Sequence, residues 1–89
     1  MSARQPAIAV LGAGSWGTAL ALLLSRNGAL VRLWGHLPEQ VSRLQKDGEN
    51  REFLPGIPFP GGLQVTGDLA AALEAVDEIL VVVPSHAFR

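Results

Sequence analysis

The sequence predicts an α/β fold with a doubly wound parallel sheet, truncated after its fourth strand. Four short apolar runs alternate with segments of helical pattern along the 89 residues. The last of these runs is β-branched and apolar throughout, as a strand covered on both faces must be. The alternation of strands and helices requires right-handed crossovers between parallel strands, and the simplest spatial order of the four strands is 3-2-1-4.

Size and composition limit the class of protein. Eighty-nine residues form one small domain or part of a larger one, because typical domains contain about 100–150 residues. The net charge of −1 gives no reason to expect a nucleic acid or an acidic membrane surface as partner. The absence of cysteine excludes a disulfide scaffold, a thiolate metal site and a cysteine nucleophile. Because no signal peptide and no apolar stretch of about 18 residues is present, we expect a soluble protein without a membrane span.

The first half of the chain contains two strands joined by a helix. The unbroken apolar run Ala7–Leu11 predicts the first strand. A helix is expected from about Ser15 to Arg26, where a basic residue in the last turn precedes the helix-ending Gly28. The second strand is Leu30–Trp34.

A short polar helix is expected next. Pro38 suits its first turn, Val41 and Leu44 lie on its inner face, and Gly48 ends it. The following segment, 49–62, holds three prolines and three glycines, from which we predict a loop without regular elements. Its large apolar side chains argue against a domain linker, and we expect them to pin the loop: Phe53, Leu54, Ile57 and Phe59.

The last part of the chain contains two further strands. Leu63–Thr66 is a short third strand, and Asp68 is a good N-cap for a helix with apolar residues at helical spacing as far as Val76. The run Glu78–Pro84 predicts a central strand with a neighbour on each side. Because the chain ends at Arg89, soon after this strand, we expect an N-terminal fragment of a larger enzyme.

A glycine-rich turn carries the strongest functional signal. Gly12, Gly14 and Gly17 form a G-x-G-x-x-G pattern between a strand and a helix, which is the context of a Rossmann-type dinucleotide site. The first glycine permits the tight turn, the second lets the backbone approach a pyrophosphate, and the third lets helix and strand pack closely. The backbone N–H groups of Ser15 and Trp16 would face the pyrophosphate at the helix N-terminus. Alternatively, the turn binds nothing, and the Trp16 ring packs against the helix.

The end of the second strand bears on the choice of cofactor. A site selective for NAD usually has an acidic residue there, whereas this chain has Trp34-Gly-His36. Without a carboxylate to repel a 2′-phosphate, either NADP or NAD is acceptable. His36 is the candidate for contact with the phosphate or the adenine, and it can equally be an ordinary surface histidine. Arg32 and Arg43 are weaker candidates for the phosphate contact. Side chains alternate along a strand, which allows that of Arg32 to point away from the site, and Arg43 is expected in solvent.

Two residues near the end of the chain resemble a nucleophile and its base. Ser85 and His86 are adjacent in an extended segment, so their side chains point to opposite sides and are poorly placed to share a proton. Phe88 offers a flat apolar wall to a nicotinamide ring, or it simply packs in the core.

Four segments, spread over nearly the whole chain, match the motifs of one known family in the same order. They are Gly12–Leu20, Leu33–His36, Asn50–Ile57 and Ile79–Phe88. Together they resemble bacterial NAD(P)-dependent glycerol-3-phosphate dehydrogenase. The glycine motif occurs in many enzymes. The Leu-Pro-Gly-Ile sequence at 54–57 and the Val-Val-Pro-Ser-His-Ala-Phe sequence at 82–88 are far more specific to this family.

The resemblance implies an activity, a cofactor and a location. The activity is reversible reduction of dihydroxyacetone phosphate to sn-glycerol 3-phosphate in the cytoplasm, for glycerophospholipid synthesis, and a homodimer is compatible with it. Ser15, Trp16 and His36 match the family's NADPH-contacting residues, and Phe88 matches an aromatic residue near the nicotinamide. The family's catalytic lysine and phosphate-binding residues come from later segments, including a helical second domain, so no catalytic residue is expected in this chain.

Two other functions are compatible with the residues. One is a different β-hydroxyacid or ketopantoate-type reductase that shares the same N-terminal half. The other is a nucleotide-binding sensor module without catalysis. The sequence beyond Arg89 would discriminate between an enzyme and a sensor. A suitable lysine in a helical region favours an enzyme, and a DNA-binding motif favours a sensor.

Overall fold

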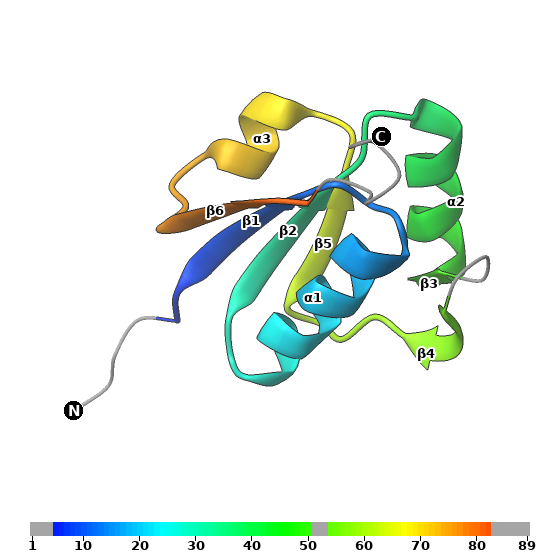
Figure 1. The fold of residues 1–89 in the computed structure, drawn as a ribbon, viewed down its shortest axis with the longest axis horizontal. Coiled ribbons are helices and arrows are strands. Elements are labelled where there is room, and N and C mark those ends of the chain that lie inside the picture. Colours follow the sequence, from blue (N-terminus) through cyan, green and yellow to red (C-terminus); the bar gives the residue numbers. More distant parts are fainter. Residues whose placement is uncertain (1–4, 51–53, 83–89) are drawn as a thin grey trace, which may run out of the picture.

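The computed structural model describes residues 5–50 and 54–82 and contains a parallel sheet flanked by helices (Figure 1). The elements of the main sheet and its helices are, in chain order, β1 (Ala7–Leu11), α1 (Ser15–Arg26), β2 (Leu30–Trp34), α2 (Pro38–Asp47), β5 (Leu63–Thr66), α3 (Leu69–Leu73) and β6 (Glu78–Val81). Two further strands, β3 (Glu49–Asn50) and β4 (Leu54–Pro58), form a separate ribbon.

The four strands of the main sheet lie in the order β5-β2-β1-β6, and all neighbouring pairs are parallel. This confirms the predicted α/β class and the strand order 3-2-1-4. Two right-handed crossovers move outward from β1 to β5, and the third returns to the other side of β1. The chain therefore places α1 on one face of the sheet and α3 on the other, with α2 beside the edge strand β5 (Figure 1).

The core lies between the sheet and α1. Val10, Val31 and Leu33 are fully buried on the inner strands, as expected for strands covered by helices. Val41 and Leu44 are buried on the inner face of α2, as predicted. Each of the first two helices also ends as the sequence indicates. Gly28 follows α1 with a positive φ, and Gly48 ends α2 in the left-handed conformation.

The segment after α2 corrects one prediction. Residues 49–62 were expected to lack regular elements, yet β3 and β4 pair as an antiparallel ribbon with an irregular register next to Asn50. Proline is tolerated there because a two-stranded ribbon leaves many backbone N–H groups outside the ladder. The N–H of Gly56 donates to Glu49 Oε2 at 3.1 Å and supports the ribbon. Ile57 and Phe59 pack against the core, as expected, whereas Phe53 lies outside the described residues.

The last helix is shorter than its apolar pattern indicates. α3 ends at Leu73, and Ala75 has a φ of 56°, so Val76 lies beyond the helix rather than on it. A tertiary contact stabilises this early end, because Arg32 Nη1 on β2 donates to the backbone carbonyls of Ala71 and Glu74. These carbonyls belong to the end of the helix, which needs partners of this kind.

The fourth strand lies at an edge of the described sheet, as the order 3-2-1-4 predicts. Within residues 5–50 and 54–82, β6 pairs with β1 alone. The neighbour predicted for its other side belongs to the complete domain and stays a prediction. The side chains of β6 are largely exposed, with Ile79 at 51% and Val81 at 68%.

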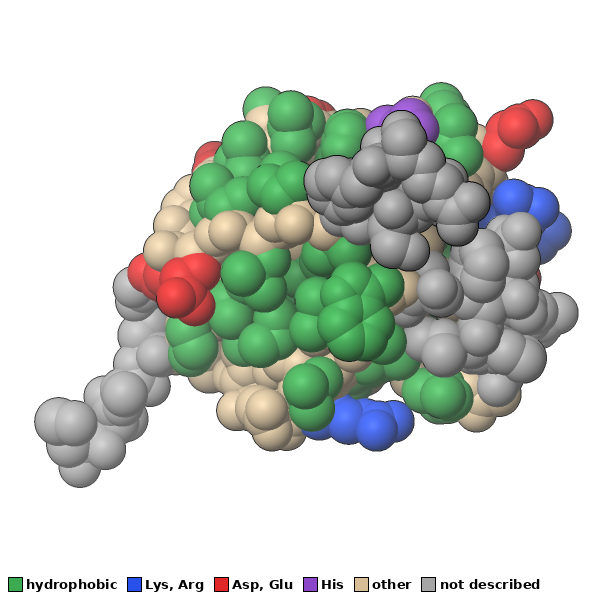
Figure 2. Space-filling view, viewed as in Figure 1, with side chains coloured by type: hydrophobic (Ala, Val, Ile, Leu, Met, Phe, Trp, Pro, Cys, Tyr) green, Lys and Arg blue, Asp and Glu red, His purple; other side chains and the backbone are tan. Residues whose placement is uncertain are grey.

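Figure 2 shows hydrophobic side chains gathered on the face that carries α1 and the neighbouring strands. No helix in the described part of the chain has the length and apolar character needed to cross a membrane.

The N-cap of α3 generates a stability prediction. Asp68 Oδ1 accepts hydrogen bonds from the N–H groups of Ala70 and Ala71, at 3.0 and 3.3 Å. We expect Asp68→Ala to lower the free energy of unfolding by about 1 kcal/mol, because both N–H groups lose their partner. Asp68→Ser keeps a capping oxygen and should lose much less. Urea unfolding of the variants measures both values, and equal losses would contradict the capping role.

Candidate functional site: the glycine turn and its rim

The carboxyl ends of the parallel strands bring two predicted site segments together. The turn after β1 contacts the segment after β2, because the N–H of Gly12 donates to the carbonyl of Trp34 at 2.8 Å. A Cβ on Gly35 would lie 3.0 Å from Cβ of Ala13 and 3.1 Å from Cγ2 of Val41, so the turn, the end of β2 and α2 are closely packed. The end of β5 joins them, since the N–H of Gly35 donates to the carbonyl of Thr66 at 3.2 Å.

The three glycines of the motif meet different surroundings. A Cβ on Gly17 would lie 1.6 Å from the carbonyl oxygen of Gly12, so no larger residue fits between α1 and the turn. Gly12 has a φ of +132°, and a Cβ there would lie 2.5 Å from the carbonyl oxygen of Val82. A Cβ on Gly14 would meet nothing within 4 Å. Packing thus requires glycine at positions 12 and 17, whereas Gly14 faces open space.

The N-terminus of α1 is arranged to receive an anion. Its N-cap is Gly14, no side chain in the described part of the chain caps it, and its first turn holds no acidic residue. The α3 helix is a useful contrast, because Asp68 caps its N–H groups. The first N–H groups of a helix have no partner within the helix and carry a partial positive charge. An oxyanion at Gly14 would satisfy them.

The variable residues of the motif are placed at the start of this helix. Ser15 is the first residue of α1, and Trp16 follows with its side chain 65% exposed. The Trp16 side chain is therefore largely exposed to solvent, and its role as a cofactor contact stays a prediction.

The end of β2 forms a shallow depression. His36 is exposed there, with its ring centroid 6.2 Å from that of Trp34 at a tilted angle. The indole Nε1 of Trp34 donates to the carbonyl of Gly67 at 3.2 Å, which ties this rim to the start of α3. The depression has a volume of about 330 Å³ and is lined by residues from the ends of β2 and β5 and from α2: Gly35, His36, Pro38, Val41, Ser42, Gln45 and Gly67. It lies next to the glycine turn, which packs against Gly35.

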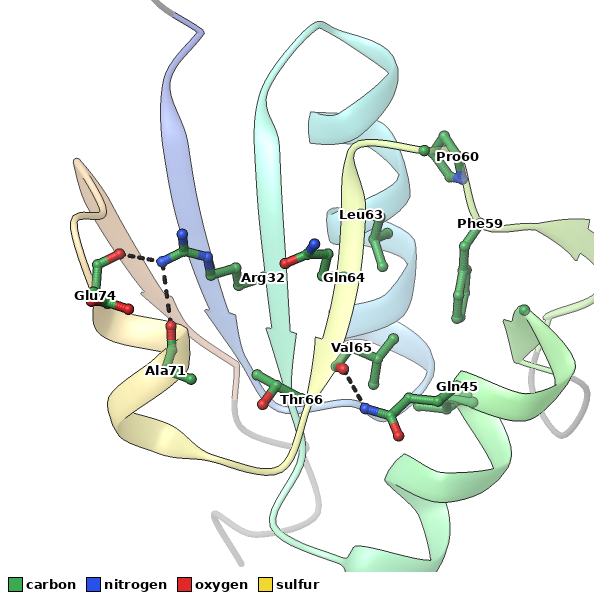
Figure 3. Close-up of a pocket in the computed structure, with 13 residues that line it drawn as sticks. Arg32, Gln45, Phe59, Pro60, Leu63, Gln64, Val65, Thr66, Ala71 and Glu74 are labelled. Atoms are coloured by element: carbon green, nitrogen blue, oxygen red, sulfur yellow. Dashed lines mark hydrogen bonds between the residues drawn. The ribbon is translucent and has the colours of Figure 1, made fainter.

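A larger groove of about 660 Å³ lies elsewhere, along the outer edge of β5 (Figure 3). The glycine turn contributes none of its described lining residues. Figure 3 shows Arg32 reaching from β2 toward α3, and Gln45 Nε2 reaching from α2 to the carbonyl of Val65 at 2.7 Å. Arg32 therefore points away from the rim, as the alternation of side chains along a strand indicated. Arg43 is exposed on α2, as expected.

Some predicted site residues are not placed, and two others were missed. Ser85, His86 and Phe88 lie outside the described residues. Sequence reasoning did not identify Thr18 and Asn50 as site residues, although both are buried and joined by a hydrogen bond of 3.0 Å beneath the glycine turn. The signal that was available was the polar Thr18 at the start of an otherwise apolar helix.

The fold and rim define a doubly wound, Rossmann-type α/β domain. The family described as NAD-dependent glycerol-3-phosphate dehydrogenase N-terminus matches residues 7–89. The chain belongs to this family.

Curated relatives and solved structures agree with this assignment. The chain is 62% identical over 82 residues to a glycerol-3-phosphate dehydrogenase (NAD(P)+) of Tolumonas auensis, covering 92% of this chain and 25% of the relative. An Escherichia coli O1:K1 protein of the same name is 54% identical over 88 residues, covering 99% and 26%. The chain thus spans about a quarter of the length of the curated relatives it matches.

The structural neighbours carry the same fold. A crystal structure of glycerol-3-phosphate dehydrogenase from Coxiella burnetii matches with a TM-score of 0.86 and 54% identity, over 94% of this chain and 26% of that one. A glycerol-3-phosphate dehydrogenase structure from Plasmodium falciparum matches with a TM-score of 0.73 and 27% identity, over 94% and 26%.

The contrast between two glycines gives the prediction for this site. We expect Gly17→Ala to lower the free energy of unfolding by about 3 kcal/mol or more, because the methyl group collides with the carbonyl of Gly12. Gly14→Ala should change it by less than about 1 kcal/mol, because its φ of −74° suits alanine and the methyl group meets open space. Denaturant unfolding measures both. A Gly14→Ala loss as large as that of Gly17→Ala would refute the difference in packing.

Proposed function

We propose that this chain is the N-terminal part of an oxidoreductase that reduces dihydroxyacetone phosphate to sn-glycerol 3-phosphate with NADPH or NADH. It supplies part of the cofactor site, and the remaining domain and a helical substrate domain lie in the rest of the enzyme. The observation that carries the proposal is the open face of Gly14 at the uncapped N-terminus of α1, in a chain of this family.

The glycine turn is proposed as the binding site of the cofactor's pyrophosphate. The proposed site consists of Gly12, Gly14, Ser15, Trp16 and Gly17. The backbone N–H groups at Gly14, Ser15 and Trp16 are proposed to bind the diphosphate, since the N–H of Gly12 is already bonded to the carbonyl of Trp34. Gly14 lets the diphosphate approach the main chain, while Gly12 and Gly17 keep α1 close to β1. The partial positive charge at the start of α1 adds an attraction that does not depend on any basic side chain.

The adenosine end of the cofactor fits the depression beyond β2. His36 lines this depression, the ring of Trp34 lies 6.2 Å from the His36 ring, and the strand ends without an acidic residue. A carboxylate at this place would select NAD by binding the ribose hydroxyls and repelling a 2′-phosphate. Its absence makes NADP acceptable, and we propose that His36 contacts the phosphate.

The chemical step relies on residues beyond this chain. The bound nicotinamide cofactor supplies the hydride, and the protein must bind, orient and polarise the substrate carbonyl. We assign no catalytic residue to these 89 residues. Phe88, which lies outside the described residues, is proposed as the apolar wall beside the nicotinamide. The phosphorylated substrate, the cytoplasmic location, the role in glycerophospholipid synthesis and a homodimeric assembly rest on the family resemblance alone.

The full-length protein should oxidise NADPH only when dihydroxyacetone phosphate is present, as followed by the loss of NADPH absorbance. Gly14→Ala should raise KM for NADPH about tenfold, because forcing a methyl group into a close contact costs about 1–3 kcal/mol. Oxidation with ketopantoate but not with dihydroxyacetone phosphate would overturn the proposed substrate.

His36 should affect the choice between the two cofactors. We expect His36→Ala to raise Kd for NADPH about threefold to tenfold and to leave Kd for NADH almost unchanged, because the lost contact involves the 2′-phosphate. Arg43→Ala removes an exposed side chain outside the depression and serves as the control. Titration of the tryptophan fluorescence gives both constants. An equal loss for NADPH and NADH would exclude a role in phosphate selection.

A further inference from the structure

We propose that Asn50 is a positioning residue for the glycine turn, acting through the hydroxyl of Thr18, and that it thereby sets the affinity for the cofactor's diphosphate. This inference rests on the proposed function and adds a residue of the β3–β4 ribbon to the cofactor site. Asn50 does not reach the open face of the turn itself, since it is buried beneath it at 2% exposure.

Two buried side chains form a relay of hydrogen bonds to the turn. The amide Nδ2 of Asn50 donates to Thr18 Oγ1 at 3.0 Å, and this hydroxyl donates to the backbone carbonyl of Ala13 at 3.3 Å. Thr18 is 0% exposed. Buried amides and hydroxyls are costly unless they are hydrogen-bonded, so the relay ties both side chains to one position of the Ala13 carbonyl.

The direction of the relay follows from the available donors. The carbonyl of Ala13 can only accept, so the Thr18 hydroxyl must give it its one proton. The oxygen of that hydroxyl can then accept from Asn50, whose amide group carries two protons. A carboxylate in place of the amide would accept only and would compete with Ala13 for the hydroxyl proton.

Holding the Ala13 carbonyl also orients the next N–H group. The peptide between Ala13 and Gly14 is trans and planar, so its carbonyl and its N–H point in opposite directions. With the carbonyl bonded to the buried hydroxyl, the Gly14 N–H points away from the core. No atom lies within 4 Å of the place that a Cβ on Gly14 would take, so a diphosphate can come close to the backbone at this residue.

The relay gives the β3–β4 ribbon a function. Asn50 lies opposite Leu54 in the ribbon register, at the start of the specific Leu-Pro-Gly-Ile segment. The pairing of the ribbon extends to the residue that ends α2, since the N–H of Phe59 donates to the carbonyl of Gly48 at 2.7 Å. The ribbon can therefore fix Asn50 under the glycine turn, although Asn50 and Thr18 are 32 residues apart in the chain.

The test uses the full-length protein and isosteric variants. Thr18→Val removes the relay without changing the side-chain shape, and we expect Kd for NADPH to rise about fivefold to tenfold. KM for NADPH should rise in proportion while kcat at saturating NADPH stays the same, as for a loss of uniform binding. Thr18→Ser keeps the hydroxyl and should recover most of the affinity.

Asn50 supplies an independent second variant. Asn50→Asp is nearly isosteric but takes the hydroxyl proton from Ala13, so it should weaken NADPH binding at least as much as Asn50→Ala. Since both residues act through one relay, combining Asn50→Ala with Thr18→Val should weaken binding little more than Thr18→Val alone.

A control for general destabilisation is Leu63→Ala, at the opposite end of the sheet. It should lower the unfolding midpoint and leave Kd for NADPH unchanged. If the wild-type protein binds NADPH and the relay variants bind equally well, this inference is overturned while the proposed function stands. The same holds if affinity falls in Leu63→Ala as it does in the relay variants. A folded wild-type protein that binds no NADPH overturns the proposed function, and this inference with it.

Discussion

The contact between Gly17 and the carbonyl of Gly12 is the constraint on which the rest of the structure depends. A Cβ at Gly17 would lie 1.6 Å from that oxygen, so the first turn of α1 rests directly on the turn that leaves β1. This approach places the helix N-terminus at the carboxyl edge of the sheet. The direction of α1 and the location of its unpaired N–H groups both follow from it.

The parallel sheet then extends this point into a rim. Because parallel strands share one direction, the ends of β1, β2 and β5 lie along one edge. Hydrogen bonds join the turn to β2, β2 to β5, and the indole of Trp34 to Gly67. The open face of Gly14 and the depression beside His36 both lie at this edge of the sheet.

Local signals predicted the elements that local chemistry decides. Gly48 ends α2 in the left-handed conformation, and the apolar strands β1, β2 and β5 occupy the predicted residues. Tertiary contacts decided the rest. Arg32 on β2 stabilises the early end of α3, and β3 pairs with β4 in a segment whose prolines argue against strands. The edge position of β6 follows from the absence of a further strand among the described residues.

The candidate site, like the fold, was predicted where local sequence patterns determine it and missed where long-range contacts do. The glycines were identified because each has a steric task that spacing reveals. The relay from Asn50 to Thr18 was missed because its residues lie 32 positions apart, and no local pattern marks a hydrogen bond of that range. The structure adds to the sequence prediction the buried support under the turn.

The most direct test of the account is a crystal structure of the full-length protein with bound NADPH. The account predicts that diphosphate oxygens lie within hydrogen-bonding distance of the backbone N–H groups at Gly14, Ser15 and Trp16, with the adenosine in the depression beside His36. A diphosphate bound elsewhere, for example in the groove along β5, would contradict it.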